Sequence, residues 1–271
     1  MMGLFLDLWF YCLVTVFGIM MGSFLNVLIL RIHADEVWWK GRSHCPHCNK
    51  ELTSTELIPI FSFIFQKGRC RGCGERISYQ YILIEILSGI LAFAAVYLFG
   101  FTFIGLIVFL ALWLLLGDFV SDLLFMEFPE IFNVGLVVLG ILYQIFYAKN
   151  DIVFISVGIA FGLIFFGLQY LLTKGKGLGE GDIRIGVIIG LFLSWPYALY
   201  SIFISYISAT IILLPLLLMK KTGMKSAIPL GVFLIPVLMF AILFPNEFKS
   251  IFFEMTPILK NPSIFLNLFY I

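Results

Sequence analysis

Four cysteines occur as two closely spaced pairs in the first third of the sequence. Cys45 and Cys48 form one CxxC pair, Cys70 and Cys73 form the second, and 21 residues separate the pairs. Four thiolates from two such turns can surround one tetrahedral zinc ion. Two disulfides are the alternative, which a reducing cytoplasm would disfavour. The spacing therefore favours a structural zinc site over disulfides or a redox pair.

Three neighbours of these pairs and one distant cysteine receive simpler interpretations. Gly72 lies within the second pair and Gly74 follows it, and we expect both to adopt the positive φ that a tight turn needs. His47 lies within the first pair and is expected at the surface, because four cysteines already complete the ligand set. Cys12 lies in an apolar stretch and is expected to pack there without chemistry.

Acidic residues gather at the end of a long apolar run. They are Asp118, Asp122, Glu127 and Glu130, with no basic residue among them. Asp118 and Asp122 are four residues apart and share one helix face. Acids at membrane depth are costly and suggest function by default, although capping a helix at the interface is an equal alternative.

A second acidic feature follows closely spaced glycines. The segment 177–184 reads GLGEGDIR, which places Asp182 at the start of an apolar helix. A phosphate-binding loop is excluded, because no GK[ST] follows and no strand precedes the glycines. Capping of that helix by Asp182 remains an alternative to a chemical role.

Together, the acids suggest one reaction. Two aspartates from different helices, brought close, can share a single proton, since adjacent negative charges repel. One carboxylate then activates a water molecule while its partner protonates a leaving amide. The spacing of Asp122 and Asp182 does not show that their helices meet.

The composition identifies the elements that must position these residues. The chain of 271 residues is 62% apolar and 12% charged, which excludes a soluble enzyme, a disordered chain and a disulfide-stapled secreted module. A net charge of +1 gives no basic excess, so no nucleic-acid partner is expected. We predict an all-α polytopic membrane protein, because helices satisfy their own backbone groups in lipid.

Charge-free runs predict about eight transmembrane helices. The runs cover 8–30, 86–117, 131–148, 152–173, 185–219 and 226–246. One span needs roughly 20 residues, so the two longest runs should each fold as a hairpin. Gly100 is the expected turn in one, and Ser194-Trp195-Pro196 breaks the other, since proline interrupts a helix.

Basic residues predict the orientation and the domain organisation. All but three of the 17 Lys and Arg residues lie on one side if eight spans alternate, the exceptions being Lys149, Lys249 and Lys260. Positive residues stay inside, so both termini should be external. The expected domains are a first transmembrane helix (1–30), a cytoplasmic zinc-knuckle domain (31–80), a transmembrane bundle (81–247) and a tail (248–271) with a short interfacial helix.

Several motifs, in sequence order, resemble those of the type IV prepilin peptidases, membrane aspartyl proteases with a GxGD motif. The resemblance covers most of the chain. The matching segments are GSFLNV (22–27) with Arg31, the CxxC pairs with GRC (68–70), ISYQY (77–81) before Glu85, SD (121–122) with FPE (128–130), GEGD (179–182) and IPLG (228–231). One GxGD alone is a weak signal, whereas the ordered set is a strong one.

The resemblance implies an activity and assigns residues to it. It implies cleavage of prepilin-like or pseudopilin precursors after glycine, at the cytoplasmic side of the cell membrane, with Asp122 and Asp182 as the catalytic pair. Many members also methylate the new N-terminus with S-adenosylmethionine, for which no motif here identifies residues. The chain departs from the family at Leu124, where a second aspartate is usual, and at Glu130, where aspartate is usual.

Two other classes of protein remain as alternatives. A polytopic transporter could use the intramembrane acids as a proton relay, but transporters of this size often contain internal repeats, and none is seen here. A zinc-bearing membrane scaffold without chemistry would leave the acids unexplained.

Overall fold

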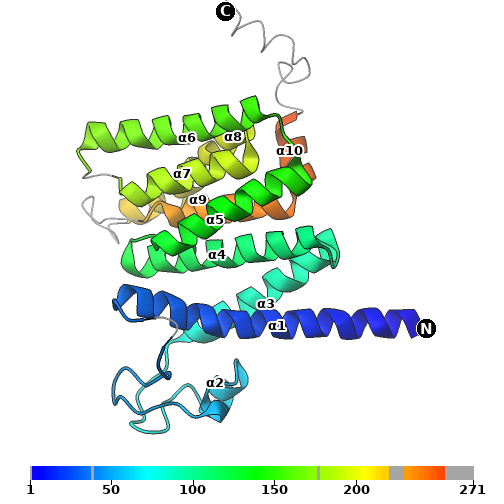
Figure 1. Ribbon diagram of the computed structural model, residues 1–271. Helices are drawn as coiled ribbons and strands as arrows, with labels where there is room; N and C mark the ends of the chain where they lie inside the picture. The colour runs from blue at the N-terminus through cyan, green and yellow to red at the C-terminus, as the bar shows by residue number, and fades with distance from the viewer. Residues whose placement is uncertain (1, 38–39, 176–177, 220–228, 254–271) are drawn as a thin grey trace, which may run out of the picture. The chain divides into compact units, whose positions relative to one another are not determined.

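The chain folds as a set of α-helices. The computed structural model describes residues 2–37, 40–175, 178–219 and 229–253 (Figure 1). The α-helices are α1 (Met2–His33), α2 (Phe61–Phe65), α3 (Tyr79–Phe99), α4 (Phe103–Phe125), α5 (Glu130–Tyr143), α6 (Ile152–Thr173), α7 (Glu180–Leu193), α8 (Tyr197–Leu218), α9 (Gly231–Leu243) and α10 (Pro245–Phe253), with a 3₁₀ turn η1 (Ser54–Glu56) and a π-helical turn η2 (Gln144–Ala148). These ranges contain no strand, so the predicted all-α class is confirmed.

The chain divides into two compact units. The first covers Met1–Leu139 and the second covers Gly140–Ile271. The boundary falls within the predicted 81–247 bundle, and each unit is described separately below. The predicted catalytic pair is divided between them, with Asp122 in the first unit and Asp182 in the second.

Six described helices are long and apolar enough to cross a membrane. They are Leu8–His33, Tyr79–Phe99, Phe103–Phe125, Glu130–Ala148, Ile152–Thr173 and Tyr197–Pro215. A seventh arises if Gly231–Leu243 and Pro245–Phe252, which meet at 106°, are counted as one bent span. The predicted total of eight is not confirmed, because α7 has only 14 residues. The predicted tail helix falls largely on residues 254–271, which lie outside the described ranges.

Both predicted helix breaks are confirmed. Helix α3 ends at Phe99, and Gly100 follows with a φ of 73°, a conformation that glycine adopts without a Cβ clash. Helix α7 ends at Leu193, and α8 begins at Tyr197, directly after Pro196. These short turns reverse the chain between consecutive helices.

Small residues bring α1 and α3 into close contact in the first unit. A Cβ at Gly22 would lie 2.7 Å from Glu85 Cα, and one at Gly18 would lie 2.8 Å from the Ser88 carbonyl oxygen. The Ser88 hydroxyl donates to the Gly18 carbonyl at 2.7 Å. Small residues that let backbones approach are typical of packed transmembrane helices. The contact fixes the helices that flank the 31–80 segment.

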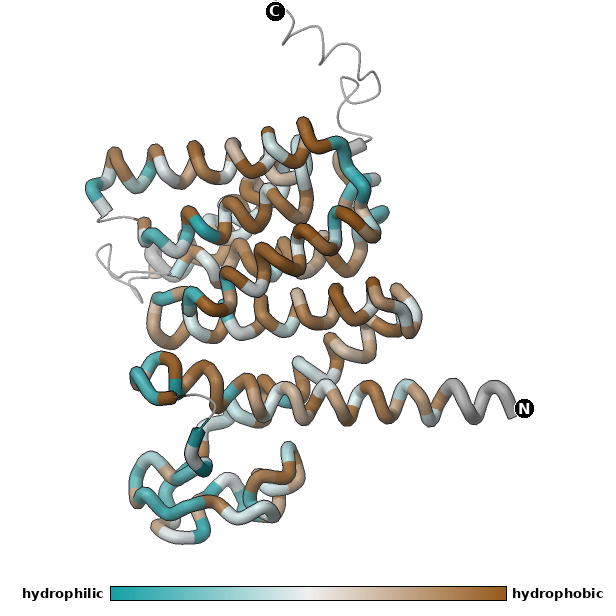
Figure 2. Tube along the Cα trace, in the orientation of Figure 1, coloured by the Kyte–Doolittle hydropathy of each residue, from teal (hydrophilic) through white to brown (hydrophobic). Residues whose placement is uncertain are grey.

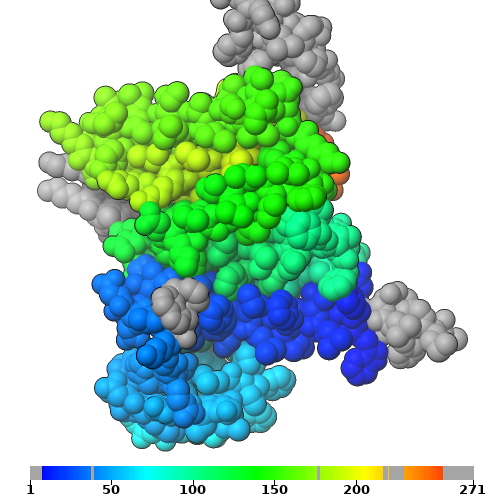
Figure 3. Space-filling view, in the orientation of Figure 1, coloured from blue at the N-terminus to red at the C-terminus, as the bar shows by residue number. Residues whose placement is uncertain are grey.

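The 31–80 segment forms a separate lobe on α1 and α3 within the first unit (Figure 3). It is more hydrophilic than either helix, as the hydropathy colouring shows (Figure 2). The guanidinium of Arg31, at the end of α1, donates to the carbonyl oxygens of Lys40, Gly41 and Arg42 at 3.0–3.3 Å. These bonds fix the first turn of the lobe against the helix end.

Helices α6 and α7 pack even more closely in the second unit. A Cβ at Gly162 would collide with the Gly186 carbonyl oxygen, and one at Gly158 would lie 2.9 Å from the Gly190 carbonyl oxygen. The amide of Gln144 donates to the Leu191 carbonyl at 2.7 Å and to the Ser194 hydroxyl at 3.2 Å. Backbone contact along α6 and hydrogen bonds at the far end therefore position α7, the helix that carries Asp182.

Candidate active site and zinc site

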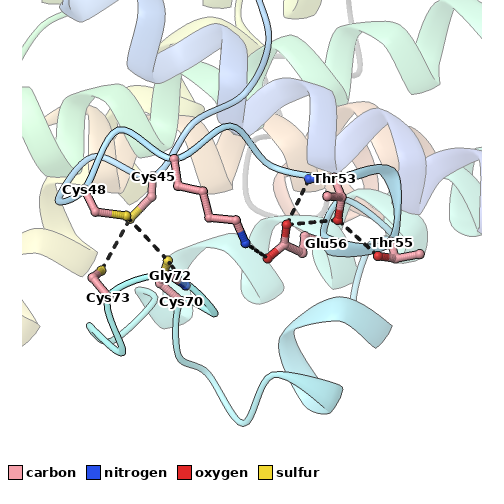
Figure 4. A network of polar contacts seen from close by, with 9 residues as sticks. Cys45, Cys48, Thr53, Thr55, Glu56, Cys70, Gly72 and Cys73 are labelled. Carbon is pink, nitrogen blue, oxygen red and sulfur yellow. Dashed lines mark hydrogen bonds and ion pairs between the residues drawn. The ribbon is translucent and has the colours of Figure 1, made fainter.

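The four predicted zinc ligands lie together. The sulfur atoms of Cys45, Cys48, Cys70 and Cys73 are all within 4.8 Å of one another. The Cys45–Cys73 and Cys48–Cys70 sulfur distances are both 4.0 Å (Figure 4). A tetrahedral ion with Zn–S bonds of about 2.3 Å separates its sulfur ligands by about 3.8 Å. The donor set and its spacing therefore fit a zinc ion.

Both cysteine turns have the same backbone hydrogen bonds. In the first, the N–H of Cys45 donates to the Lys50 carbonyl at 3.0 Å, and the Cys45 carbonyl accepts from Asn49 at 2.9 Å. In the second, Cys70 makes the same two bonds, with Glu75 and Gly74, at 2.8 and 2.9 Å. Two turns of equal shape present two sulfurs each, as a tetrahedral site requires.

The structure corrects one expectation about the glycines in the second turn. Gly74 has the predicted positive φ, 76°, and Asn49 takes the same place in the first turn with a φ of 55°. Gly72 does not have a positive φ. Glycine is needed at this position for lack of room, because a Cβ there would lie 3.0 Å from Lys50 Cδ and 3.3 Å from Cys48 Sγ. The missing side chain lets the two turns approach.

The local environment favours a thiolate at Cys70. Backbone N–H groups of Cys73 and Gly72 donate to its sulfur and lower the pKa of the thiol to about 6. The Gly72 bond is 3.3 Å long. Thiolates are the metal-binding form of cysteine. The turn therefore favours the ionised state that zinc binding uses.

A buried carboxylate supports the first cysteine turn. The carboxylate of Glu56 accepts from the Thr53 N–H and from Lys50 Nζ, each at 2.9 Å (Figure 4). The Thr53 N–H, followed by Lys50, lowers the pKa of Glu56 to about 2. Lys50 belongs to the first turn through its carbonyl, so the ion pair connects that turn to η1.

Glu85 connects the lobe to the helices. Its carboxylate accepts the backbone N–H of Ile60 at 2.7 Å, although the two residues are 25 positions apart. Its partner is therefore a backbone group of the lobe and not a basic side chain. Asn26 donates to the Tyr81 carbonyl at 3.2 Å, which supports a role in hydrogen bonding between helices.

Two of the four clustered acids on α4 and the following turn are buried. Asp118 is 0% exposed and Asp122 is 4% exposed. Within the described residues, neither carboxylate oxygen of Asp118 has a hydrogen-bond partner. Glu127 and Glu130 are exposed, and Glu127 lies 4.0 Å from the His33 ring nitrogen. Burial therefore separates the candidate acids, Asp118 and Asp122, from those that face solvent.

Asp182 combines a structural contact with an unused oxygen. It is the third residue of α7 and is 7% exposed. Its Oδ2 accepts the N–H of Gly179 at 3.0 Å, so Asp182 helps to cap α7 from its third position, and Gly179 is the N-cap residue itself. Its Oδ1 is buried and has no hydrogen-bond partner among the described residues. One oxygen orients the carboxylate, and the other is available for chemistry.

The glycine of the GxGD segment that precedes α7 needs no special backbone. Gly179 has a φ of −81° and a ψ of 160°, which any residue can adopt. A Cβ there would meet only Asp182 Oδ2, at 3.7 Å. The backbone conformation at Gly179 therefore does not require glycine.

These features define a class of protein: a helical, multi-pass membrane protein with a Cys₄ cluster that could hold zinc and with buried aspartates. Residues 16–99 match the family model of the bacterial peptidase A24 N-terminal domain. Residues 106–214, which include Asp122 and Asp182, match that of the type IV leader peptidase family. The chain belongs to the type IV leader peptidase family, as the resemblance predicted, and is a multi-pass protein of the bacterial inner membrane.

Curated relatives support this assignment over most of the chain. A prepilin leader peptidase/N-methyltransferase of Legionella pneumophila is 30% identical over 83% of this chain and 88% of its own length. Proteins with the same name from Aeromonas hydrophila and Bacillus subtilis (strain 168) are 30% and 33% identical, over 83% and 66% of this chain and 87% and 71% of their own lengths. No solved structure matches the chain. The transporter alternative receives no support from these similarities.

Proposed function

We propose that this protein is a prepilin leader peptidase that uses Asp122 and Asp182 as its catalytic pair. The observation that carries the proposal is the carboxylate of Asp182, with one oxygen fixed by Gly179 and the other buried without a partner. Burying an acid without a basic partner costs folding free energy, so such acids are retained mainly where they have a function. Membership of a leader peptidase family gives it a use.

Two carboxyl groups are sufficient for the reaction. The ionised aspartate removes a proton from water, and the water oxygen forms a bond to the carbonyl carbon of the peptide. The protonated aspartate then donates its proton to the amide nitrogen, and the carbon–nitrogen bond breaks. The products are a leader with a new carboxyl end and a mature chain with a new amino end. Like-charge repulsion keeps one proton on the pair.

Asp122 is preferred to Asp118 as the partner for two reasons. It occupies the position of the motif aspartate, between Ser121 and the FPE segment. It also lies one turn, about 5 Å, closer to the end of α4 at Phe125. A scissile peptide bond at the membrane boundary would lie nearer to this end of α4, and so nearer to Asp122 than to Asp118.

The substrate class follows from the relatives and from the predicted orientation. Two curated relatives that match 83% of this chain are named prepilin leader peptidase/N-methyltransferase. A basic leader would remain in the cytoplasm for the same reason that basic residues of this chain do. The scissile bond would then lie at the inner boundary, where Asp122 and Asp182 are predicted to lie.

Zinc has a structural role in this proposal. Cys45, Cys48, Cys70 and Cys73 would hold it, and the ion would supply folding energy to the 31–80 lobe. All four positions of a tetrahedral ion are then occupied by thiolates, so none is open for water. The lobe, held to α3 by Glu85, would support recognition of the leader without entering the reaction.

A second activity is proposed from the relatives' names alone. They are also named N-methyltransferases, so this chain would methylate the new amino group with S-adenosylmethionine as methyl donor. Asn26, one of the polar residues of the first motif, is bonded between helices. No residue is assigned to the methyl donor, and no step is derived through it.

The test is processing of a precursor expressed together with the protein. Asp122→Asn and Asp182→Asn preserve side-chain size but cannot accept a proton from water. Each change should lower cleavage by at least about 10³-fold, and the double variant should be no worse, because residues that act as a unit are not additive. Gel mobility of the precursor measures the result.

Asp118→Asn is the matched control on the same helix. It should retain at least about a tenth of wild-type cleavage if Asp118 makes no contact with the reacting atoms. Normal processing by the Asp122 or Asp182 variant, at wild-type protein level, would refute the aspartyl mechanism. Loss confined to the Asp118 variant would show that the wrong turn of α4 was chosen.

A further inference from the structure

The second unit contains a cavity at the end of α7 opposite Asp182. Its volume is about 200 Å³, and the ends of α5, α7 and α9 surround it together with η2, α8 and α10. Leu193, in the cavity wall, lies 11 residues after Asp182 on α7, so the cavity lies about 16 Å along the helix from Asp182. Neither the proposed peptidase reaction nor the zinc site uses it.

The wall of the cavity includes a buried tyrosine whose hydroxyl has no hydrogen-bond partner among the described residues. Tyr143 is 3% exposed, and its ring packs against Tyr147 and Phe192, with centroid distances of 5.2 and 5.5 Å. No described residue forms a hydrogen bond with its hydroxyl, although Tyr143 lines the cavity. A buried tyrosine usually finds a hydrogen-bond partner for its hydroxyl. The cavity is where a ligand atom could supply one.

A half-buried cation lies in the same wall. Lys249, on α10, places its ammonium 5.7 Å from the centre of the Tyr197 ring. Within the described part of the chain, no carboxylate lies within 4.0 Å of it. Glu247, two residues earlier on α10, is exposed. A cation beside apolar groups requires a negative partner or a hydrogen-bond acceptor.

The rest of the lining identifies the kind of molecule that fits. The lining combines apolar side chains, among them Phe192, Leu193 and Phe248, with the polar side chains of Asn150, Asn246 and Lys249. An amphipathic ligand with one negative group matches this combination. A free inorganic anion would leave the apolar side chains unused.

The position of α10 places the cavity at a membrane surface. Helix α10 turns by 106° from α9, so it runs across the end of the bundle and not through it (Figure 1). Four aromatic residues gather at this end of the unit: Tyr147 in η2, Trp195 in the turn between α7 and α8, and Tyr197 and Tyr200 in the first turn of α8. Aromatic residues of this kind concentrate at the level of lipid headgroups.

We propose that this cavity binds the phosphate group of an anionic phospholipid. The Lys249 ammonium faces the phosphate, and the Tyr143 hydroxyl donates a hydrogen bond to one of its oxygens. The glycerol region of the lipid covers the apolar side chains of the cavity, and the acyl chains remain in the bilayer. The site lies at the membrane surface opposite Asp182, and it does not depend on the peptidase reaction.

The test measures lipid retention by the full chain, purified in a neutral detergent, by native mass spectrometry. Phosphatidylglycerol, phosphatidylcholine and inorganic phosphate are added separately at equal concentrations. The wild type should retain phosphatidylglycerol at about tenfold lower concentration than phosphatidylcholine. Lys249→Gln should raise the concentration needed for phosphatidylglycerol about tenfold, and Lys249→Arg should restore it, because it keeps the charge.

Lys149→Gln is the matched control, since Lys149 is exposed and lies outside the cavity lining. It should change retention less than about twofold. Tyr143→Phe removes only the hydroxyl and should weaken retention several-fold while the fold persists. Equal retention of the two lipids, equal effects of the Lys249 and Lys149 changes, or binding of phosphate as tight as that of phosphatidylglycerol would each overturn the proposal.

Discussion

Glu85 on α3 holds the backbone of Ile60 in the 31–80 lobe through a single 2.7 Å hydrogen bond. Ile60 has a φ of 64° and a ψ of −56°, which is an unfavourable conformation for a β-branched residue. The carboxylate of Glu85 is itself only slightly exposed, because the residue is 7% accessible. The bond therefore both docks the lobe on the helices and holds the first turn of α2 in place.

Removing this carboxylate should loosen the lobe. Glu85→Ala leaves the N–H of Ile60 without its acceptor, at a cost of about 1–3 kcal/mol in the free energy of unfolding of the lobe. Trypsin should then cut within 40–76 several-fold faster, while the helices stay inserted. Glu85→Gln keeps an acceptor oxygen and should fall between the wild type and the alanine variant. Limited proteolysis in membranes measures these rates.

Glu75→Ala is the control for this experiment. Glu75 is an exposed acid in the same lobe, and only its backbone carbonyl takes part in the second cysteine turn. Its side chain should be dispensable, so cleavage should match that of the wild type. Equal acceleration by the Glu75 and Glu85 variants would mean that the bond to Ile60 does not hold the lobe.

Zinc should be bound with a stoichiometry of one per chain. Cys45→Ser removes one thiolate, and the remaining three hold zinc more weakly. The lobe should become sensitive to protease, and chelator should have the same effect on the wild type. Elemental analysis of protein purified without chelator measures the metal. Cys12→Ser is the control, because Cys12 lies on α1 outside the cluster and should leave zinc content unchanged.

The lobe should face the cytoplasm. In a Cys12→Ser background, a maleimide that cannot cross the membrane should label Lys149→Cys on whole cells and leave Glu75→Cys unlabelled. Both positions are exposed, so access and not burial decides the result. The expectation rests on the one-sided distribution of Lys and Arg. Labelling of Glu75→Cys alone would invert the orientation and place the proposed active site outside.

The sequence was sufficient where a local rule determines the structure. Four cysteines at CxxC spacing predicted a cluster, and the cluster forms. Gly100 and the Ser194–Pro196 segment predicted breaks, because glycine and proline act on the backbone at their own positions. The expectation of a positive φ failed at Gly72. A side chain is excluded there because the first cysteine turn, which is distant in sequence, packs against this position.

The sequence was insufficient where the partner is distant or is a backbone group. The hydrogen bond from Ile60 to Glu85 depends on how the lobe folds back over 25 residues. Every residue except proline has a backbone N–H, so the residue types do not indicate which one is the donor. The sequence predicted either a helix cap or a reactive carboxyl group at Asp182. In the structure Oδ2 makes the capping bond, and Oδ1 is left for the second role. The pairing of Asp122 with Asp182 stays a prediction, since local patterns do not determine how distant helices meet.

The contact between α6 and α7 gives a prediction about how Asp182 is positioned. Gly162→Ala places a methyl group against the backbone of Gly186, and neither backbone can move without shifting a helix. Overpacking of this kind costs about 1–3 kcal/mol in stability. We expect a lower melting temperature and a fall in precursor cleavage that exceeds the loss of folded protein, because the displaced helix carries Asp182 at its start.

Gly167→Ala, on the same helix, separates this effect from a general cost of substitution. A Cβ at Gly167 would meet nothing within 4 Å, and alanine favours a helix by about 1 kcal/mol over glycine. The variant should therefore be as stable as the wild type or slightly more so, with normal cleavage. Thermal unfolding in detergent and the gel assay are run on both proteins. If Gly162→Ala behaves like Gly167→Ala, the close α6–α7 contact does not position Asp182, and the hydrogen bonds from Gln144 at the far end of α7 must be sufficient.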